Sequence, residues 1–391
     1  MKNLLQKYEK KLINHGLCLP GEPLLGGLDA DLVWNRNAAD IQELKKLFDR
    51  LTINSLLFAK PAEPYFSILN FLAEESMNAG EFIPDDTETR TFLHSIPVTK
   101  VLSAENAALS LKRRKCLVVK DRGIIGWGTV SPEQAFITFS SVCFAGFVKF
   151  FTDFYTAKKE GGLRKNMEEL FRFAINEYLK SRKELPAVEI LNKGPFTSGA
   201  EIMSAMDEAG KKLVDCRMVD SFFGNISYRQ GNGIYISQTG SSLDELTGCI
   251  DNVPLDGSSC TGLTASSEYT SHREVLIEND YSCILHGHPK FAVILSMLCD
   301  KKDCGNRGLC YKNCKEKRFA AGLPIIPGEV GTGPTGLVHT LPPALKEYEG
   351  TIVYGHGLFT KGSGDFRKAF SLMLETEQQC MEEYLKKLEK K

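Results

Sequence analysis

The sequence has almost no net charge and no hydrophobic run long enough to cross a membrane. Lys plus Arg number 48 and Asp plus Glu 49, so the formal net charge is −1 over 391 residues. That balance gives no bulk attraction to nucleic acid or to an anionic membrane. The most hydrophobic stretch, residues 135–148, contains Ser140 and Ser141 and is shorter than the roughly 18 apolar residues of a membrane span. We therefore expect a buried helix there, and no nucleic acid and no membrane as partner.

A secretory signal is also missing, because residues 1–7 run into charged residues without an apolar segment. The chain nevertheless has 12 cysteines, unevenly spaced. Without an export signal, a reduced, cytoplasmic protein is expected rather than a disulfide scaffold. The length predicts two domains.

Three pairs of segments recur in the same order in the two halves, which predicts an internal duplication. The pairs are residues 53–57 with 219–223, residues 92–97 with 284–289, and, without a gap, residues 122–136 with 356–370. Apolar patterning shared by any two α/β segments is the alternative explanation. The charged segment 158–184 is expected to be a terminal helix and linker, which gives domains 1–187 and 188–391.

The two copies differ at polar positions. In these alignments Ile96 stands for His288, Arg122 for His356, and residues 58–59 for residues 224–225. We therefore expect only the second copy to bind a metal. The first copy is then a degenerate domain without metal ligands, with a structural or regulatory role.

Three histidines of the second copy form a candidate metal site. The apolar run 281–285 ends at His286-Gly287-His288-Pro289, and in a strand this spacing places both imidazoles on one face. His356 follows a second strand-like run, between two glycines that allow the backbone to approach a ligand closely. Three His ligands with an open position are typical of catalytic zinc. Scattered structural histidines are the alternative, and His339 is a weaker candidate.

Five motifs follow one another in the second half of the chain: residues 224–227 (GNIS), 236–240 (ISQTG), 266–268 (SSE), 286–289 (HGHP) and 355–357 (GHG). In this order they resemble the signature of the class II aldolase/adducin family, and the resemblance covers the chain from about residue 190 to the C terminus. The resemblance implies an α/β fold with a central mixed or largely antiparallel sheet flanked by helices, which the repeat would present twice. It also implies a divalent metal, most often Zn²⁺, at His286, His288 and His356.

The motifs also suggest roles for the polar residues between them. Ser266 and Ser267 precede a predicted helix, 269–277, whose N-terminal N–H groups suit a phosphate. The resemblance implies that Asn225, Thr239 and Gly240 complete this phosphate site, although a simple turn and a helix cap explain these residues equally well. It implies that Glu268 is the general base, with a fourth metal ligand or a first-turn acid as alternatives.

The activity implied is that of a lyase, an aldolase acting on a short sugar phosphate through an enediolate stabilised by the metal. An epimerase, a dehydratase or a decarboxylase of the same superfamily is the alternative, as is a non-catalytic, adducin-like interaction protein. The family's fourfold rings and the duplication together suggest a homo-oligomer, in which a dimer forms a pseudo-tetramer.

A cysteine cluster departs from the family pattern. Residues 299–314 form a polar insertion with the spacing C-x4-C-x5-C-x3-C, made by Cys299, Cys304, Cys310 and Cys314. Four thiolates suit a second zinc ion or an iron–sulfur cluster. Free thiols are the alternative.

Overall fold

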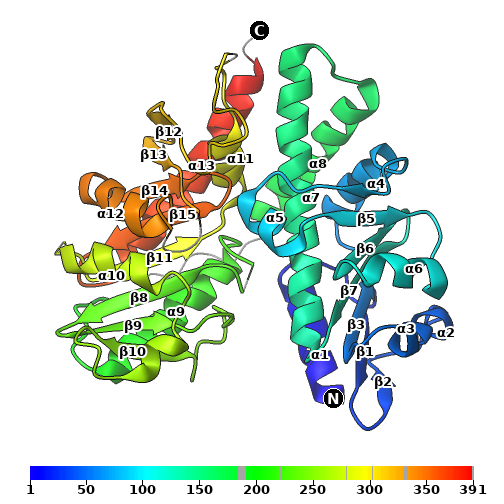
Figure 1. Cartoon of the computed structure of the whole chain (residues 1–391), viewed down its shortest axis with the longest axis horizontal. Coiled ribbons are helices and arrows are strands. Elements are labelled where there is room, and N and C mark those ends of the chain that lie inside the picture. The colour runs from blue at the N-terminus through cyan, green and yellow to red at the C-terminus, as the bar shows by residue number, and fades with distance from the viewer. Residues whose placement is uncertain (184–190, 221, 279, 302, 330–332, 390–391) are drawn as a thin grey trace. The chain divides into compact units, whose positions relative to one another are not determined.

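The chain forms two compact units, Met1–Glu184 and Leu185–Lys391, in a computed structural model. The structure describes residues 1–183, 191–220, 222–278, 280–301, 303–329 and 333–389. The expected domain boundary near residue 188 therefore lies outside the described residues. Each unit holds one β-sheet (Figure 1).

The N-terminal unit has a seven-stranded sheet of order β2-β1-β3-β7-β6-β5-β4. Its strands are β1 (Leu24–Leu28), β2 (Leu32–Trp34), β3 (Ser55–Ala59), β4 (Glu81–Phe82), β5 (Ile96–Thr99), β6 (Cys116–Val119) and β7 (Gly123–Gly128). Its helices are α1 (Lys2–Asn14), α2 (Ile41–Leu44), α3 (Lys46–Arg50), α4 (Tyr65–Glu75), α5 (Thr87–Leu93), α6 (Ala104–Leu111), α7 (Pro132–Glu160) and α8 (Lys165–Lys183). Only the β5–β6 pair is parallel among the described pairings of this sheet.

The C-terminal unit has an eight-stranded sheet of order β10-β9-β8-β11-β15-β14-β13-β12. Its strands are β8 (Asn225–Gln230), β9 (Gly233–Ser237), β10 (Ile250–Pro254), β11 (Cys283–Gly287), β12 (Arg318–Ala320), β13 (Leu323–Ile326), β14 (Gly350–Val353) and β15 (Gly357–Gly362). Its helices are α9 (Gly199–Asp215), α10 (Tyr269–Glu278), α11 (Lys290–Met297), α12 (Leu337–Glu347), α13 (Arg367–Glu389) and the short 3-10 helix η1 (Cys260–Leu263). Here only the described pair β13–β14 is parallel.

The two sheets are built alike, which confirms the predicted fold and its presence twice. Strands β2-β1-β3-β7-β6-β5-β4 correspond in order to β9-β8-β11-β15-β14-β13-β12, and β10 is an addition at one edge of the second sheet. Every corresponding pair of neighbours has the same direction, including the parallel pair next to the last strand. Both sheets are therefore mixed but largely antiparallel.

The structure supports one of the three predicted segment matches and corrects the other two. Strands β7 and β15 begin at Gly123 and Gly357 and end at Gly128 and Gly362, as the gapless match requires. Residues 53–57, however, lead into β3, whereas residues 219–223 precede β8, which corresponds to β1. Residues 96–97 begin β5, whose counterpart is β13 and not β11. Short apolar strands resemble one another in sequence, so only the pairing identifies the true partners.

The register gives the correct equivalences for β11, the strand that carries His286. Ser55 pairs with Gly128 in the first sheet, and Cys283 pairs with Gly362 in the second. Counting from these pairs, residues 58–61 (FAKP) correspond to residues 286–289 (HGHP). Lys60, and not Ile96, therefore takes the place of His288, and Phe58 takes the place of His286.

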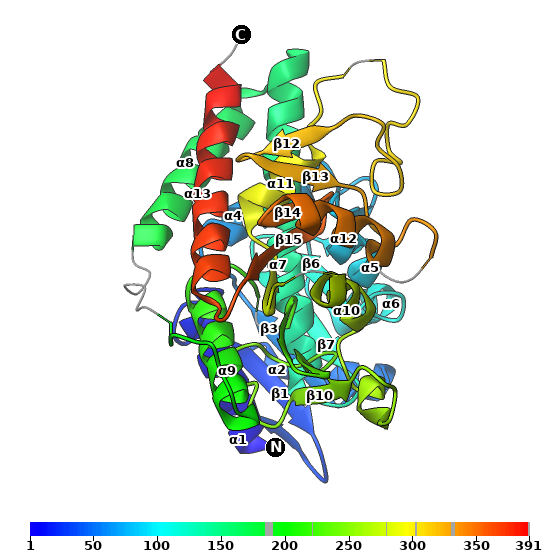
Figure 2. The ribbon, with the colours of Figure 1, turned by 90° about the vertical axis from the view of Figure 1, so that its left-hand side faces the viewer.

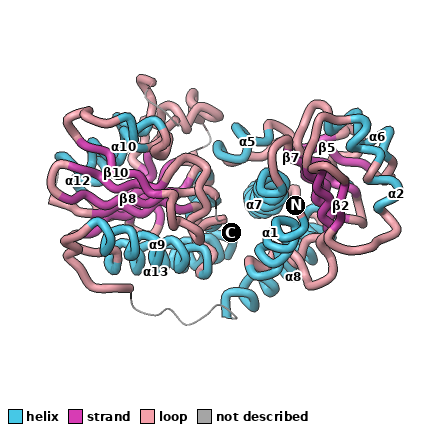
Figure 3. Tube along the Cα trace, turned by 90° about the horizontal axis from the view of Figure 1, so that it is seen from below, coloured by secondary structure: helices cyan, strands magenta, loops and turns pink. Residues whose placement is uncertain are grey.

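Helices cover both faces of each sheet (Figure 3). In the N-terminal unit α1 and α7 lie on one face and α2 and α6 on the other. In the C-terminal unit α9 and α13 lie opposite α10 and α12. Helix α7 contains the predicted buried stretch and is long and apolar enough to cross a membrane, yet 83% of its most apolar window is buried inside the protein. It is accordingly a core helix, and the charged segment after residue 158 is the end of α7 followed by α8.

Candidate metal centre

Two histidines come from a central strand of the second sheet. β11 pairs with β8 on one side and with β15 on the other, and His286 lies near the end of this pairing. The Nε2 atoms of His286 and His288 are 3.0 Å apart. The Nδ1 atom of His286 lies 3.2 Å from the carbonyl oxygen of Leu358. If Nδ1 carries the proton and donates to this carbonyl, Nε2 keeps a lone pair for a metal.

The third histidine lies in the tight turn between β14 and β15. Gly355 there has a φ of +58°, a value that favours glycine. A Cβ atom on Gly357 would lie 2.5 Å from the carbonyl oxygen of Gly287 and 2.8 Å from Cε1 of His286. Glycine at this position therefore lets the turn approach β11 closely, and the ligand nitrogens of all three histidines lie within 4.8 Å of one another.

The three imidazoles are buried and held in fixed orientations. Their exposed fractions are 1% for His286, 5% for His288 and 3% for His356. The ring of His286 stacks on Phe359 at 3.8 Å between centroids, and the ring of His288 lies against Phe223 at 5.7 Å.

Burial lowers the pKa of each of these histidines, and the neighbouring imidazoles lower that of His286 further. The histidines are therefore neutral, which is the form that binds a metal. A buried cluster of three neutral imidazoles with converging nitrogens fits a divalent metal of the zinc type.

A carboxylate faces the same point. Glu268, just before α10, is 6% exposed. Its Oε2 lies 3.7 Å from Nε2 of His286 and its Oε1 lies 3.6 Å from Nε2 of His356. Asn225, which is paired with His286 across β8 and β11, donates from Nδ2 to Oε2 of Glu268 at 2.6 Å. The Oδ1 atom of Asn225 is buried without a hydrogen-bond partner.

Apart from Asn225 of β8, the residues predicted to bind phosphate lie on two adjoining segments, joined by a bridge between Gln238 and Ala265. Thr239 is exposed, and its hydroxyl donates to the carbonyl of Ala265 at 2.9 Å. Ser266 is buried, and its Oγ accepts from the backbone N–H of Glu268 at 3.3 Å. Gly240 and Ser267 are exposed. The hydroxyls of Thr239 and Ser266 thus take part in local hydrogen bonds, as a turn and a cap would.

Two histidines of the C-terminal unit lie outside the triad. His272, one turn after Glu268, is fully buried, and its Nδ1 lies 2.7 Å from the hydroxyl of Ser227. Burial lowers the pKa of His272 to about 3, so this ring is neutral. His339 lies in α12, since residues 337–347 form a helix despite two prolines.

Sequence reasoning missed a buried acid behind the site. Glu377 of α13 is 2% exposed, and its carboxylate accepts hydrogen bonds from the backbone N–H groups of Phe291, at 2.9 and 3.0 Å, and Ala292, at 3.0 Å. These groups belong to the first turn of α11, which begins two residues after His288. No local motif identifies Glu377, because its partners lie far away in the sequence.

The predicted cysteine site is less buried than the histidine site. Cys299 is exposed, and Cys304, Cys310 and Cys314 are partly exposed. Among the described residues, the histidine triad is the one group of three or more such side chains placed to hold a metal ion.

Residues 204–384 match the model of the family described as Class II Aldolase and Adducin N-terminal domain. The C-terminal unit belongs to the class II aldolase/adducin family. No curated protein matches the chain.

Solved structures similar to the chain each cover about half of it. L-fuculose-1-phosphate aldolase from Thermus thermophilus is 23% identical, with a TM-score of 0.38 over 48% of this chain and 95% of its own. A sugar-phosphate aldolase from Thermotoga maritima is 15% identical, with a TM-score of 0.36 over 49% of this chain and 96% of its own. An aldolase II superfamily protein from Pseudomonas syringae is 16% identical, with a TM-score of 0.37 over 47% and 74%.

The N-terminal unit has other side chains where the aldolase-family unit has its histidines. Arg122, in the place of His356, forms a 2.7 Å ion pair with Asp40 and lies 5.9 Å from the ring of Phe58. Lys60 lies with its Nζ 4.3 Å from the ring of Phe66. Positive charge and an aromatic ring thus occupy positions that hold neutral imidazoles in the other unit.

Proposed function

We propose that the C-terminal unit is a metal-dependent aldolase that cleaves or forms a carbon–carbon bond in a short, phosphorylated sugar. The observation that carries the proposal is the buried triad His286, His288 and His356 with the carboxylate of Glu268 within 3.7 Å of two of its nitrogens. A purely structural histidine cluster would not need a carboxylate held at the same point.

In this proposal the three histidines hold one divalent metal, with Zn²⁺ as the best match to three imidazoles. The metal, when bound, supplies Lewis acidity that stabilises negative charge on substrate oxygens. When the bond is formed, Glu268 takes a proton from the carbon next to the substrate carbonyl. When the bond is cleaved, Glu268 returns a proton to that carbon. Asn225 holds the Glu268 carboxylate in place through the 2.6 Å hydrogen bond.

The proposed phosphate site lies at the surface of the unit. Gly240 and Ser267 are exposed on the two segments that the Gln238–Ala265 bridge holds together. A Cβ atom added to Gly240 would meet no atom within 4 Å other than those of its chain neighbours, so there is room for a ligand beside this backbone. We propose that backbone N–H groups at this turn and before α10, together with Asn225, Thr239, Ser266 and Ser267, bind the phosphate.

The test is cleavage of ketose 1-phosphates, measured as release of the aldehyde product, with metal-free protein and with zinc, manganese or cobalt added back. We expect turnover only after metal is restored. An NMR spectrum of the same mixtures separates cleavage from epimerisation, dehydration and decarboxylation, which the same site could support. Bound metal without any turnover of sugar phosphates would contradict the aldolase proposal and favour an adducin-like interaction module.

Assembly and location complete the proposal. Because one chain already contains two aldolase-like units, two chains could build a ring of four units. Light scattering is then expected to give twice the 43.4 kDa of one chain, and a mass of 43.4 kDa would contradict the ring. We also propose a reducing, cytoplasmic setting, which the twelve free thiols support.

A further inference from the structure

The C-terminal unit contains a long irregular loop that has no counterpart in the N-terminal unit. Residues 76–80 join α4 to β4, whereas residues 298–317 join the corresponding elements α11 and β12. Figure 2 shows the described part of this loop, in yellow, beside β12 and β13. Both sheets have the same strand order, so the fold does not need the longer connection. Long irregular loops within compact domains are uncommon and are usually either functional or linker segments.

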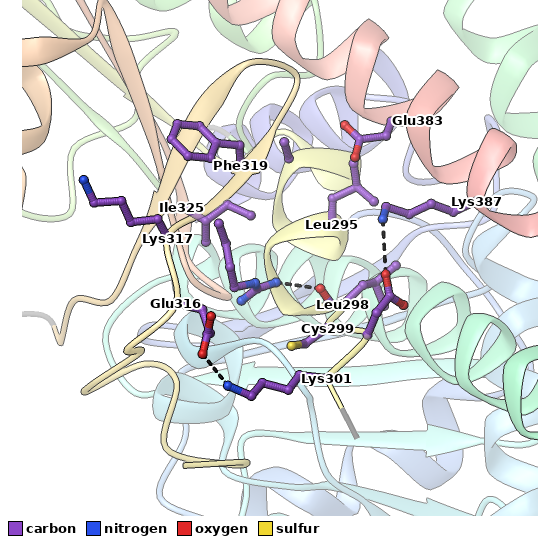
Figure 4. A pocket seen from close by; sticks show the side chains of 13 residues that line it. Leu295, Leu298, Cys299, Lys301, Glu316, Lys317, Phe319, Ile325, Glu383 and Lys387 are labelled. Atoms are coloured by element: carbon purple, nitrogen blue, oxygen red, sulfur yellow. Dashed lines mark hydrogen bonds and ion pairs between the residues drawn. The ribbon is translucent and has the colours of Figure 1, made fainter. Parts of the chain in front are cut away.

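The loop has no hydrophobic core of its own. No described residue from 299 to 317 is buried, and Leu309 is 50% exposed. Its two ends are tied together by an ion pair between Lys301 and Glu316 and by a 2.6 Å hydrogen bond from Arg318 to the carbonyl of Leu298 (Figure 4). The middle of the loop therefore needs another source of stability.

The cysteines of this loop differ from most others in the chain. Six cysteines are buried, namely Cys18, Cys116, Cys143, Cys216, Cys283 and Cys380. A buried cysteine serves as a small apolar side chain. The four loop cysteines are exposed or partly exposed, so packing does not explain them.

The same four thiols lie near one another. The side chain of Asn306, two residues after Cys304, donates to the carbonyl of Asn313, the residue before Cys314, at 3.3 Å. The side chain of Arg307 donates to the carbonyl of Lys301, two residues after Cys299, at 2.9 Å. The chain also doubles back between these cysteines. The N–H of Arg307 donates to the carbonyl of Cys304 at 3.2 Å, and the N–H of Asn313 donates to that of Leu309 at 3.0 Å.

We propose that one zinc ion is bound by four thiolates of this loop, those of Cys299, Cys304, Cys310 and Cys314. The site is structural and separate from the histidine triad. Four residues separate the first pair of cysteines and three the second, which is the usual range for zinc pairs. The common iron–sulfur spacings differ from this one.

Zinc binding would draw the loop together. On binding, the four thiols must converge on the ion and lose their protons. Lys301, Lys312 and Lys315 lie in the same loop, and their positive charge offsets the net negative charge of a zinc ion with four thiolates.

The first test is metal content per chain by mass spectrometry, on protein purified without oxygen and loaded with zinc. We expect two zinc ions per chain, one in Cys310→Ser/Cys314→Ser, one in His286→Ala, and none in the combined variant. Cys260→Ser, which replaces an exposed cysteine outside the loop, is the matched control and should keep two. One zinc in the wild type that only His286→Ala removes would overturn the proposal and leave the proposed aldolase intact. Iron with sulfide would overturn zinc as the ion.

A second measurement on the wild-type chain avoids variants that fail to fold. Cobalt added in place of zinc should give the intense near-ultraviolet absorption of thiolate-to-cobalt charge transfer, which a site of three histidines cannot give. His286→Ala should keep that absorption. A cobalt-loaded wild-type chain without it, or a disulfide between two of the loop cysteines, would overturn the four-thiolate site.

Discussion

The two units share one strand order and differ at the positions that would hold a metal. Strand β3 and the residue after it present Phe58 and Lys60 where β11 and its extension present His286 and His288. Arg122 stands for His356 in the equivalent turn. The sheet forms in both cases because backbone pairing and apolar packing build it. Histidines at the strand ends are therefore additions to this fold and not conditions for it.

The difference extends to the layer behind the site. Counting seven residues on from the matched Phe136 and Phe370, Cys143 of α7 stands where Glu377 stands in α13. Cys143 is 1% exposed and Glu377 2%. One unit thus buries a thiol where the other buries a carboxylate bonded to the start of α11. Burying a carboxylate is costly unless hydrogen bonds compensate, and here the N–H groups at the start of α11 supply them, so Glu377 supports the segment that follows His288.

The largest effect should follow removal of a histidine from the aldolase-family unit. We expect His286→Ala to lose the triad metal and to reduce turnover to background, because only two of the three imidazole ligands remain to hold the ion. The matched variant Phe58→Ala changes the equivalent position of the N-terminal unit and should leave metal content and turnover unchanged. Metal analysis and the sugar-phosphate cleavage assay measure both. Equal losses in the two variants would end the assignment of separate roles to the units.

The second largest effect is expected at Glu268, the proposed general base of the C-terminal unit. Glu268→Gln keeps the size of the side chain but cannot take up a proton. We expect kcat to fall by about 10²- to 10⁴-fold with the metal retained. Glu278→Gln, at the exposed end of α10, is the control and should not change kcat. Loss of the metal in Glu268→Gln would instead make Glu268 a fourth ligand.

A smaller effect is expected at Glu377, which acts through α11. Glu377→Gln weakens the hydrogen bonds to the N–H groups of Phe291 and Ala292, so His288 loses part of its support. We expect metal affinity to fall by about 10- to 100-fold while kcat of the fully loaded enzyme changes little. Zinc titration with a competing chelator measures the affinity. Glu375→Gln, exposed on the same helix, is the control, and an equal drop there would exclude a positioning role.

Much of this comparison could be predicted from the sequence. The HGHP and GHG motifs led to three histidines that the structure brings together, since a two-residue spacing in a strand fixes a common face. The equivalence of β3 with β11 could not be predicted, because FAKP and HGHP share little more than the final proline. Glu377 was missed for a different reason. A cap supplied from another helix leaves no local pattern, and only the packing of α11 on α13 reveals it.

The smallest effect on the proposed metal site is expected at Asp86, because this residue affects the stability of the N-terminal unit alone. Asp86 caps α5 and is fully buried, with its carboxylate accepting from the N–H of Thr89 at 2.7 Å. Burial raises the pKa of Asp86 from 3.8 to about 7. The folded state therefore binds this proton more tightly than the unfolded state. The contribution of Asp86 to the free energy of unfolding is therefore fully present below pH 4. This contribution falls as the pH rises toward 7, by a few kcal/mol at most.

Asp86→Asn should abolish this loss, because asparagine keeps the acceptor for Thr89 and never ionises. Both tryptophans, Trp34 and Trp127, lie in the N-terminal unit, so denaturant unfolding followed by tryptophan fluorescence reports that unit. The gap between wild type and Asp86→Asn should widen from pH 4.5 to 7. Zinc should leave the fluorescence transition unmoved, because a ligand stabilises the unit that binds it. A transition shifted by zinc would mean that the N-terminal unit also binds the metal or unfolds together with its partner, and the contrast between the units would then fail.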